Sequence, residues 1–174
     1  VGVDLSPHSD PPGGERSIRE ELGVGPDDVV VTCVAELNEN KNHDFLLDAW
    51  RELNKRCNSA HLLLVGKGKR MEILQKRVEK EQIPRVYFLG YRQDVPQILK
   101  ETDIAALVSR REGLPKCIME AMAMGLPVVA SNVRGNRDLV ENGRTGFLVK
   151  LGDISGLVRA LERLILDREL RATM

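Results

Sequence analysis

Two glutamates, Glu112 and Glu120, carry the clearest chemical signal in the sequence, with a Gly-Leu-Pro tripeptide between them. Glu120 is the only charged residue from Cys117 to Met124, in an otherwise apolar helical pattern. An ionised carboxylate in such a run needs partners, and a ribose diol offers two hydroxyl donors to its two oxygens. The alternative is that Glu120 pairs with a nearby Lys or Arg or faces solvent. The pattern alone leaves both open, and Glu112 taken alone reads as an exposed loop carboxylate.

The segment between the glutamates predicts an anion site. Pro115 suits the first position of a helix expected over 115–124. The free N–H groups of Gly113, Leu114 and Lys116 would then point out of the helix start and, with the helix dipole, favour a phosphate. A glycine at 113 also lets a ligand approach the backbone closely.

These residues must be positioned by alternating strands and helices. We expect strands over 29–35, 61–65, 86–89, 104–108, 126–130 and 146–149. We expect helices over 17–22, 43–56, 71–81, 95–101, 115–124 and 154–166. Strands that are apolar without alternation indicate a parallel sheet covered by helices on both faces. The predicted fold class is therefore α/β, a doubly wound, Rossmann-like parallel sheet, because six units are too few for an eightfold barrel.

Ligands of such folds bind beyond the carboxyl ends of the strands. The loops to inspect are 36–42, 66–70, 90–94, 109–115 and 131–137. We interpret Gly66 and Gly68 as plain turn glycines. Cys117, at a helix start, is either a thiol of lowered pKa or a small packing residue, and the second interpretation is preferred.

Composition excludes several classes of protein. The 174 residues are 42% hydrophobic and amount to one domain. Twenty-six basic residues balance twenty-six acidic ones and only 3% are aromatic, which argues against nucleic acid as a partner. Cys33, Cys57 and Cys117 form no C-x-x-C pair, which argues against a zinc site or a disulfide framework and fits a cytosolic setting. The chain starts at Val1 and ends at Met174 within a helical pattern, so we expect a piece of a longer protein.

The segment 112–131, E-G-L-P-x4-E-A-M-A-x-G-x-P-V-V-A-S, resembles the signature of retaining glycosyltransferases of group 1, also called family 4. Further segments resemble other motifs of that family, in the right order: 3–4, 35–42, 64–68, 86–96 and 135–149. The resemblance implies a GT-B architecture, in which two Rossmann-like domains enclose a cleft. It makes residues 1–28 an interdomain hinge or linker with a short helix, and residues 29–174 the second, nucleotide-sugar-binding domain. The N-terminal acceptor domain and the C-terminal return helices would then be absent.

The resemblance also assigns roles to matching positions. Glu112 would contact the donor sugar at the reacting centre as the catalytic residue, Glu120 the ribose hydroxyls, and Lys41 the diphosphate. The backbone of Gly113, Leu114 and Pro115 would lie against the sugar and diphosphate, and Tyr91 and Arg92 would hold the base, largely through their backbone. A lysine and a helix start can stabilise the leaving diphosphate without a metal, so we expect no metal and no cofactor.

One departure from the family concerns the first loop. The usual G-R-L reads Ala-Glu-Leu at 35–37, so an arginine that normally joins the lysine at the phosphates is replaced by Glu36. The candidates to replace it are Arg110, Arg111 and Lys116. The segment 132–138 resembles enzymes of bacterial exopolysaccharide or capsule assembly.

The resemblance therefore implies transfer of a hexosyl or N-acetylhexosaminyl unit from a nucleoside diphosphate sugar, on family frequency a UDP-sugar, to a glycan or lipid-linked glycan held by the missing domain. The chain alone would bind donor but transfer poorly. The full-length enzyme would be cytoplasmic, with peripheral attachment to the inner face of the membrane in keeping with a lipid-linked acceptor. Two alternatives stay open. One is a non-catalytic nucleotide or nucleotide-sugar binding module, which Glu36 favours, and the other is a GT-B nucleotide-sugar epimerase, which the spacing of the two glutamates disfavours.

Overall fold

A computed structural model describes residues 17–174, and the hinge motif expected at 3–4 lies outside these residues. The strands are β1 Val29–Val34, β2 Ala60–Val65, β3 Val86–Gly90, β4 Ile104–Leu107, β5 Val128–Ser131 and β6 Gly146–Val149. The helices are α1 Ile18–Leu22, α2 His43–Leu53, α3 Met71–Lys80, α4 Val95–Lys100, α5 Lys116–Ala123, α6 Arg134–Arg137, α7 Ile154–Leu166 and α8 Arg168–Thr173. All the expected strands and helices are present, with ends shifted by a few residues.

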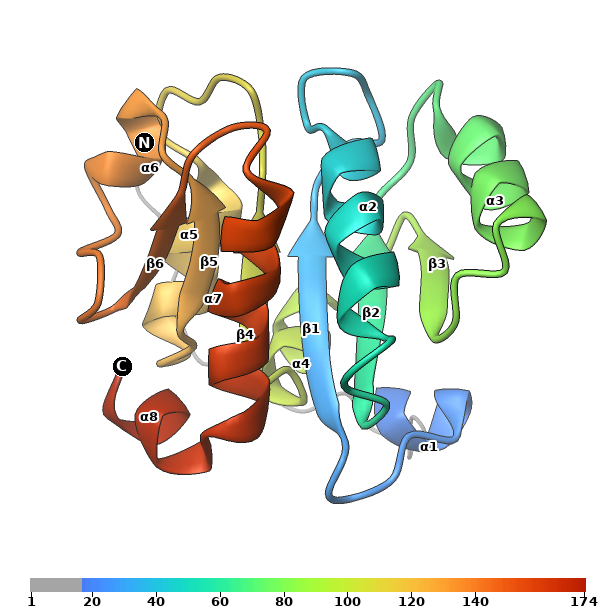
Figure 1. Ribbon diagram of the computed structural model, residues 1–174, viewed down its shortest axis with the longest axis horizontal. Coiled ribbons are helices and arrows are strands. Elements are labelled where there is room, and N and C mark those ends of the chain that lie inside the picture. Colours follow the sequence, from blue (N-terminus) through green and yellow to red (C-terminus); the bar gives the residue numbers. More distant parts are fainter. Residues whose placement is uncertain (1–16) are drawn as a thin grey trace.

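The six strands form one parallel sheet in the order β3-β2-β1-β4-β5-β6. This is the doubly wound order, so the predicted fold class is confirmed. The direction of winding reverses between β1 and β4, which are neighbours in the sheet. In Figure 1 the carboxyl ends of the strands point upward, and the loops that follow them gather along the top of the molecule. Within residues 17–174, no helix combines the length and apolar character needed to cross a bilayer.

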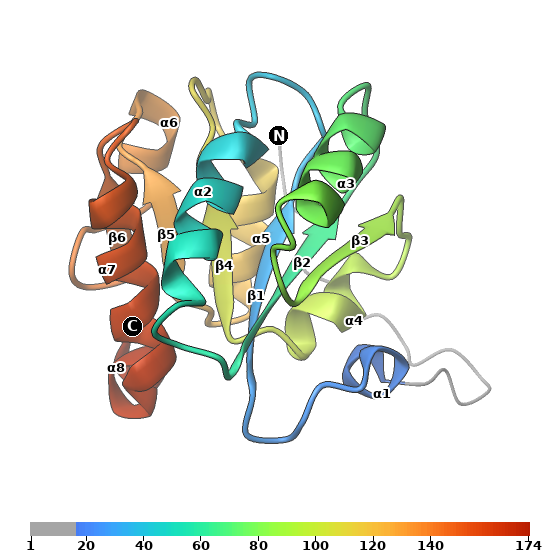
Figure 2. The same ribbon diagram turned by 45° about the vertical axis from the view of Figure 1, so that its right-hand side comes forward.

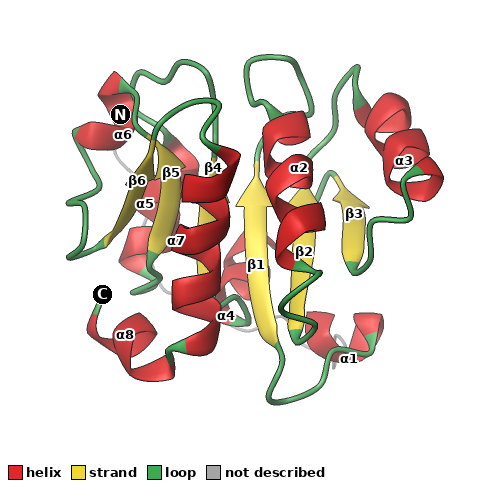
Figure 3. Ribbon diagram, viewed as in Figure 1, coloured by secondary structure: helices red, strands yellow, loops and turns green. Residues whose placement is uncertain are grey.

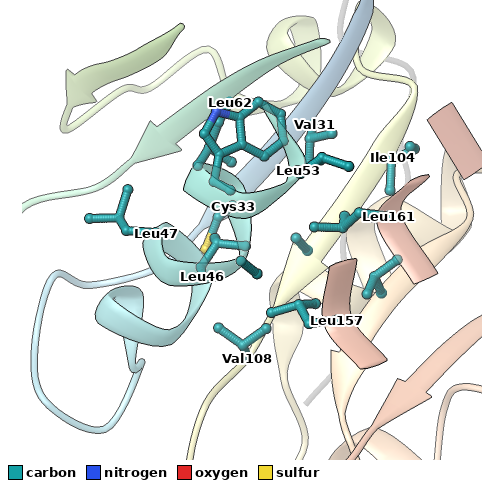
Figure 4. Packing of buried hydrophobic residues seen from close by; sticks show 14 of the residues in the cluster. Val31, Cys33, Leu46, Leu47, Leu53, Leu62, Ile104, Val108, Leu157 and Leu161 are labelled. Atoms are coloured by element: carbon teal, nitrogen blue, oxygen red, sulfur yellow. The ribbon is translucent and has the colours of Figure 1, made fainter. Parts of the chain in front are cut away.

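Helices cover both faces of the sheet (Figures 2 and 3). The main core lies between the sheet and the face formed by α2 and α7, and Figure 4 shows its packing around Cys33, Leu46, Ile104 and Leu161. Trp50 of α2 is fully buried there, and its indole N–H donates to the carbonyl of Pro84 at 3.1 Å. Alternate strand residues enter smaller apolar clusters beneath α5 and α4 on the other face. Burial on both faces explains why the strands are apolar without alternation.

Two helices were not predicted. α6 lies in the segment 131–137, which was expected to be a loop, because its sequence Arg-Gly-Asn-Arg has no apolar periodicity and contains a glycine. α8 begins where the Asp167 side chain accepts a hydrogen bond from the N–H of Leu170, a helix-capping contact. Helix α5 starts at Lys116, so Pro115 is the residue before the helix and not its first position, with φ −72° and ψ 110°.

Gly66 and Gly68 do more than turn the chain, so their interpretation as plain turn glycines is wrong. A Cβ on Gly66, where φ is +145°, would lie 2.1 Å from the carbonyl oxygen of Ala35. A Cβ on Gly68 would lie 2.2 Å from the carbonyl oxygen of Leu37. The N–H of Leu37 donates to the carbonyl of Lys67 at 2.9 Å. The loop 66–70 therefore packs backbone to backbone on the loop after β1, which only glycine permits.

Candidate functional site

A lysine and a glutamate from distant parts of the chain meet where the sheet reverses its winding. Lys41 lies in the loop after β1 and Glu112 in the loop after β4. The Lys41 Nζ atom donates to Oε1 of Glu112 at 2.6 Å. Only 21% of the Lys41 side chain and 10% of the Glu112 side chain are exposed. The crevice at such a reversal is where open α/β sheets bind their ligands. The residue expected at the reacting centre, Glu112, and the residue expected at the diphosphate, Lys41, are brought together there.

Backbone and asparagine contacts join the two loops that carry this pair. The N–H of Arg110 donates to the carbonyl of Asn40 at 2.7 Å, and Nδ2 of Asn40 donates to the carbonyl of Arg111 at 3.0 Å. Nδ2 of Asn42 donates to the carbonyl of Val108 at 3.3 Å. Neither Asn40 nor Asn42 was predicted to hold these two loops together. The sequence signal that could have indicated them is the preference of asparagine for turns and for the left-handed backbone conformation. Asn42 adopts that conformation at the start of α2, with φ +57°.

The start of α5 presents free backbone donors beside the pair. No side chain among the described residues caps this helix end. Pro115 is buried, whereas Gly113 and Leu114 are exposed, with Leu114 at 54%. The first N–H groups of a helix have no partner within the helix. The predicted arrangement of an anion-binding helix start next to a lysine is therefore present in the backbone geometry.

Glu120 lies one turn into α5 and is not buried with the core. Its Oε1 lies 3.4 Å from Nζ of Lys116, and 29% of the Glu120 side chain is exposed against 65% for Lys116. The alternative of a nearby cation as the partner of Glu120 is thus realised in the structure. Such a helical pair is worth about 0.2–0.5 kcal/mol, so a ligand hydroxyl can displace it.

Three cations were expected to replace the missing arginine, and two of them have no charged partner among residues 17–174. The side chains of Arg110 and Arg111 are exposed, while Lys116 already pairs with Glu120. Glu36 is itself exposed at the same edge of the sheet. Which cation, if any, replaces the arginine that is absent at position 36 therefore stays a prediction.

Tyr91 and Arg92 follow β3, on the other side of β1 from Glu112. The Tyr91 ring is 65% exposed, and Nζ of Lys67 lies 5.2 Å from its centroid. Arg92 donates to both carboxylate oxygens of Asp94, at 2.8 and 2.6 Å, which lowers the pKa of that carboxyl. Three strand spacings separate β3 from β4, about 14 Å in all. The candidate site is therefore long, with Tyr91 at one end and Glu112 at the other.

Two cysteines, Cys33 and Cys117, feel the charges of Lys41 and Glu112 and keep protonated thiols. Burial raises the pKa of Cys117 to about 11 and that of Cys33 to about 12. The alternative of a lowered pKa at Cys117 is therefore wrong, and the residue packs against the core under α5. Among residues 17–174, no group of three or more His, Cys, Asp or Glu is arranged to hold a metal ion.

Buried His43, two residues after Lys41, makes the stability of the fold depend on pH. Only 2% of His43 is exposed, its Nδ1 has no partner among the described residues, and burial lowers its pKa from 6.5 to about 4. The unfolded chain takes up this proton at higher pH, so the contribution is complete above pH 6.5 and is lost as the pH falls toward 4. We expect a loss of about 3 kcal/mol over that range.

Chemical unfolding between pH 7.5 and 4 measures this effect. His43→Gln removes the titrating group, so the difference in unfolding free energy between wild type and variant should shrink as the pH falls. A difference that stays constant with pH would show that His43 does not titrate on unfolding.

A family model described as glycosyl transferases group 1 matches residues 28–167. The chain belongs to the group 1 glycosyltransferases. The UDP-Gal:alpha-D-GlcNAc-diphosphoundecaprenol alpha-1,3-galactosyltransferase of Escherichia coli is 34% identical over 174 residues, which cover 97% of this chain and 45% of that protein. The capsular polysaccharide biosynthesis glycosyltransferase CapM of Staphylococcus aureus is 27% identical, over 85% of this chain and 40% of that protein.

A solved structure of related sequence has the same fold. HepE of Anabaena is 32% identical, superposes with a TM-score of 0.81, and is aligned over 90% of this chain and 43% of its own length. It was solved in complexes with UDP and with UDP-glucose. The expected GT-B relationship and the likeness to capsule and polysaccharide enzymes are thereby confirmed. The chain spans less than half the length of these relatives.

Proposed function

We propose that this group 1 glycosyltransferase chain is the donor-binding half of a retaining enzyme that transfers a sugar from a UDP-sugar to a glycan or lipid-linked glycan. Residues 29–174 would form the donor domain and residues 1–28 the hinge to an acceptor domain. The observation that carries the proposal is the contact of Lys41 with Glu112 at the switch point of the sheet. The uncapped start of α5 beside that contact adds the donors that a diphosphate needs.

The chemistry follows from the charges. As the glycosidic bond breaks, the leaving diphosphate gains negative charge and the anomeric carbon gains positive charge. The ammonium of Lys41 and the N–H groups at the start of α5 stabilise the negative charge on the diphosphate. The Glu112 carboxylate faces the positive charge on the anomeric carbon. Glu112 acts as an electrostatic and positioning group and forms no covalent bond to the sugar. The reaction proceeds on one face of the sugar, and neither a metal nor a cofactor is needed.

The donor and acceptor are inferred from relatives of similar sequence. UDP and UDP-glucose are bound by HepE, and the galactosyltransferase relative is named for UDP-galactose and for a lipid diphosphate acceptor. The transferred unit is accordingly a hexosyl or N-acetylhexosaminyl group. A lipid-linked acceptor fits a cytoplasmic full-length enzyme that attaches peripherally to the inner face of the membrane.

Transfer by the full-length protein tests this function. The protein is incubated with UDP-glucose, UDP-galactose or UDP-N-acetylglucosamine and a lipid-linked glycan, with and without EDTA, and the anomeric configuration of the product is read by NMR. We expect transfer with retention that EDTA leaves unchanged. An isomerised nucleotide sugar formed without acceptor would favour the epimerase, and saturable UDP binding with no turnover would favour the binding module.

Glu120→Ala tests the ribose assignment. Loss of two charge-assisted hydrogen bonds should weaken UDP binding by about 1–3 kcal/mol, about 5- to 150-fold. Binding of 2′,3′-dideoxy-UDP should not change, because the partner hydroxyls are missing from that ligand. Calorimetry on the full-length protein measures both, and Glu79→Ala, on the exposed surface of α3, is the matched control. Equal losses for the two nucleotides would place the ribose elsewhere.

A further inference from the structure

The short helix α6 lies against the loop that carries Glu112 (Figures 1 and 2). Gly135 of α6 is buried, and its N–H donates to the carbonyl of Glu112 at 3.3 Å. A Cβ on Gly135 would lie 2.1 Å from the carbonyl oxygen of Gly113 and 2.8 Å from that of Glu112. Both are backbone atoms, which cannot swing aside as the end of a side chain can. The contact therefore sets the position of the loop.

A second contact holds the base of the same loop. Asn136, also in α6, is fully buried, and its Nδ2 donates to the carbonyl of Ser131 at 2.8 Å and to its Oγ at 3.1 Å. The Ser131 hydroxyl donates in turn to the carbonyl of Ser109 at 2.5 Å. Ser109 begins the loop and Glu112 lies near its tip. The segment after β5 thus fastens the loop after β4 at two points.

We infer that Gly135 and Asn136 are positioning residues that hold the Glu112 carboxylate at the reacting centre. This inference rests on the proposed function, in which Glu112 faces the sugar. Neither residue needs to touch the donor. Misplacement of a reacting group by about 1 Å can cost about 100-fold in rate, so a helix that fixes the loop has a direct effect on turnover.

The backbone conformation of Gly135 allows the effect of an added methyl group to be measured without backbone strain. Positive φ angles occur at several glycines of residues 17–174, but Gly135 is not among them. Alanine is the best helix former and glycine a poor one, so Gly135→Ala brings no local backbone strain. Any effect must come from the added methyl group meeting Gly113 and Glu112.

Steady-state kinetics and hydrogen–deuterium exchange on the full-length protein test the inference. For Gly135→Ala we expect the turnover number to fall about 10- to 100-fold. The dissociation constant of UDP should change by a smaller factor than the turnover number, because Lys41 and Glu120 remain in place. Amide exchange over 109–116 should become faster. Asn136→Ala, which adds no atoms, should also lower the turnover number and speed amide exchange over 109–116. It provides the test if Gly135→Ala does not fold.

Gly146→Ala is the matched control. Gly146 also lies close to a neighbouring backbone, because an added Cβ would lie 1.9 Å from the carbonyl oxygen of Val128. It lies at the amino end of β6, away from the site. It should lower stability and spare both the turnover number of the folded enzyme and exchange over 109–116. Wild-type turnover together with wild-type exchange in Gly135→Ala would overturn the inference. A wild-type protein that transfers no sugar would overturn the proposed function instead, and the exchange data would still decide whether α6 holds the loop.

Discussion

Glu112→Gln is expected to lower the turnover number of the full-length enzyme by about 10²- to 10³-fold, the effect of removing a group aimed at charge that develops in the transition state. The same substitution should strengthen UDP binding. Glu112 Oε1 lies 2.6 Å from Nζ of Lys41, so the diphosphate must compete with this carboxylate for the ammonium. Removing the negative charge of Glu112 ends this competition. It also removes a repulsion between the carboxylate and the diphosphate of about 1 kcal/mol, which corresponds to about fivefold in affinity.

The opposite directions of the two effects make the test sharp. Initial rates at saturating UDP-sugar give the turnover number, and calorimetry gives the UDP affinity of the same preparation. A variant with both normal turnover and normal affinity would remove Glu112 from the site. A variant that loses turnover and UDP affinity together would mean that Glu112 binds the nucleotide and does not compete with it.

Lys41→Met is expected to damage both binding and catalysis. The ammonium contacts the diphosphate in the ground state and more strongly as charge develops, so we expect kcat/KM to fall about 10²- to 10³-fold. UDP affinity should fall by about 1.5–3 kcal/mol, the worth of a hydrogen bond to a charged group. Lys55→Met, which removes an exposed lysine paired with Glu52 on the surface, should leave both unchanged.

The double variant Lys41→Met with Glu112→Gln separates stability from function. Lys41→Met alone leaves a carboxylate that is only 10% exposed without its cation, at a cost of about 1–3 kcal/mol in unfolding free energy. The second substitution removes that charge, so most of the stability should return while transfer stays low. Recovery of activity along with stability would show that the pair is structural. Thermal unfolding and initial rates on one preparation measure both quantities.

Most of the fold could be predicted because each strand is apolar on both faces and each main helix has one apolar face. The runs at β1 and β2 and the periodicity of α2 and α7 express burial directly in the sequence. Helix α6 could not be predicted in this way. It is held by contacts of Gly135 and Asn136 with loops distant in sequence, and its own four residues carry no helical pattern.

The sequence indicated which residues belong to the candidate site but not which of them contact one another. Glu112, Glu120 and the helix start between them lie within one short segment, so their spacing was visible. The pairing of Lys41 with Glu112 joins positions 71 residues apart and depends on β1 and β4 being neighbours in the sheet. The ties of Asn40 and Asn42 to the Glu112 loop, and the close approach of Gly66 and Gly68 to the first loop, are also products of strand order. Sequence patterns within one element contain no information about such contacts.

Calorimetric titration of the full-length protein with UDP, GDP and ADP measures whether this chain binds the nucleotide part of a sugar donor through Lys41 and the start of α5. We expect saturable binding of UDP in preference to GDP and ADP, weakened in Lys41→Met and strengthened in Glu112→Gln. Absence of binding for all three nucleotides, or UDP binding that ignores both substitutions, would contradict this expectation.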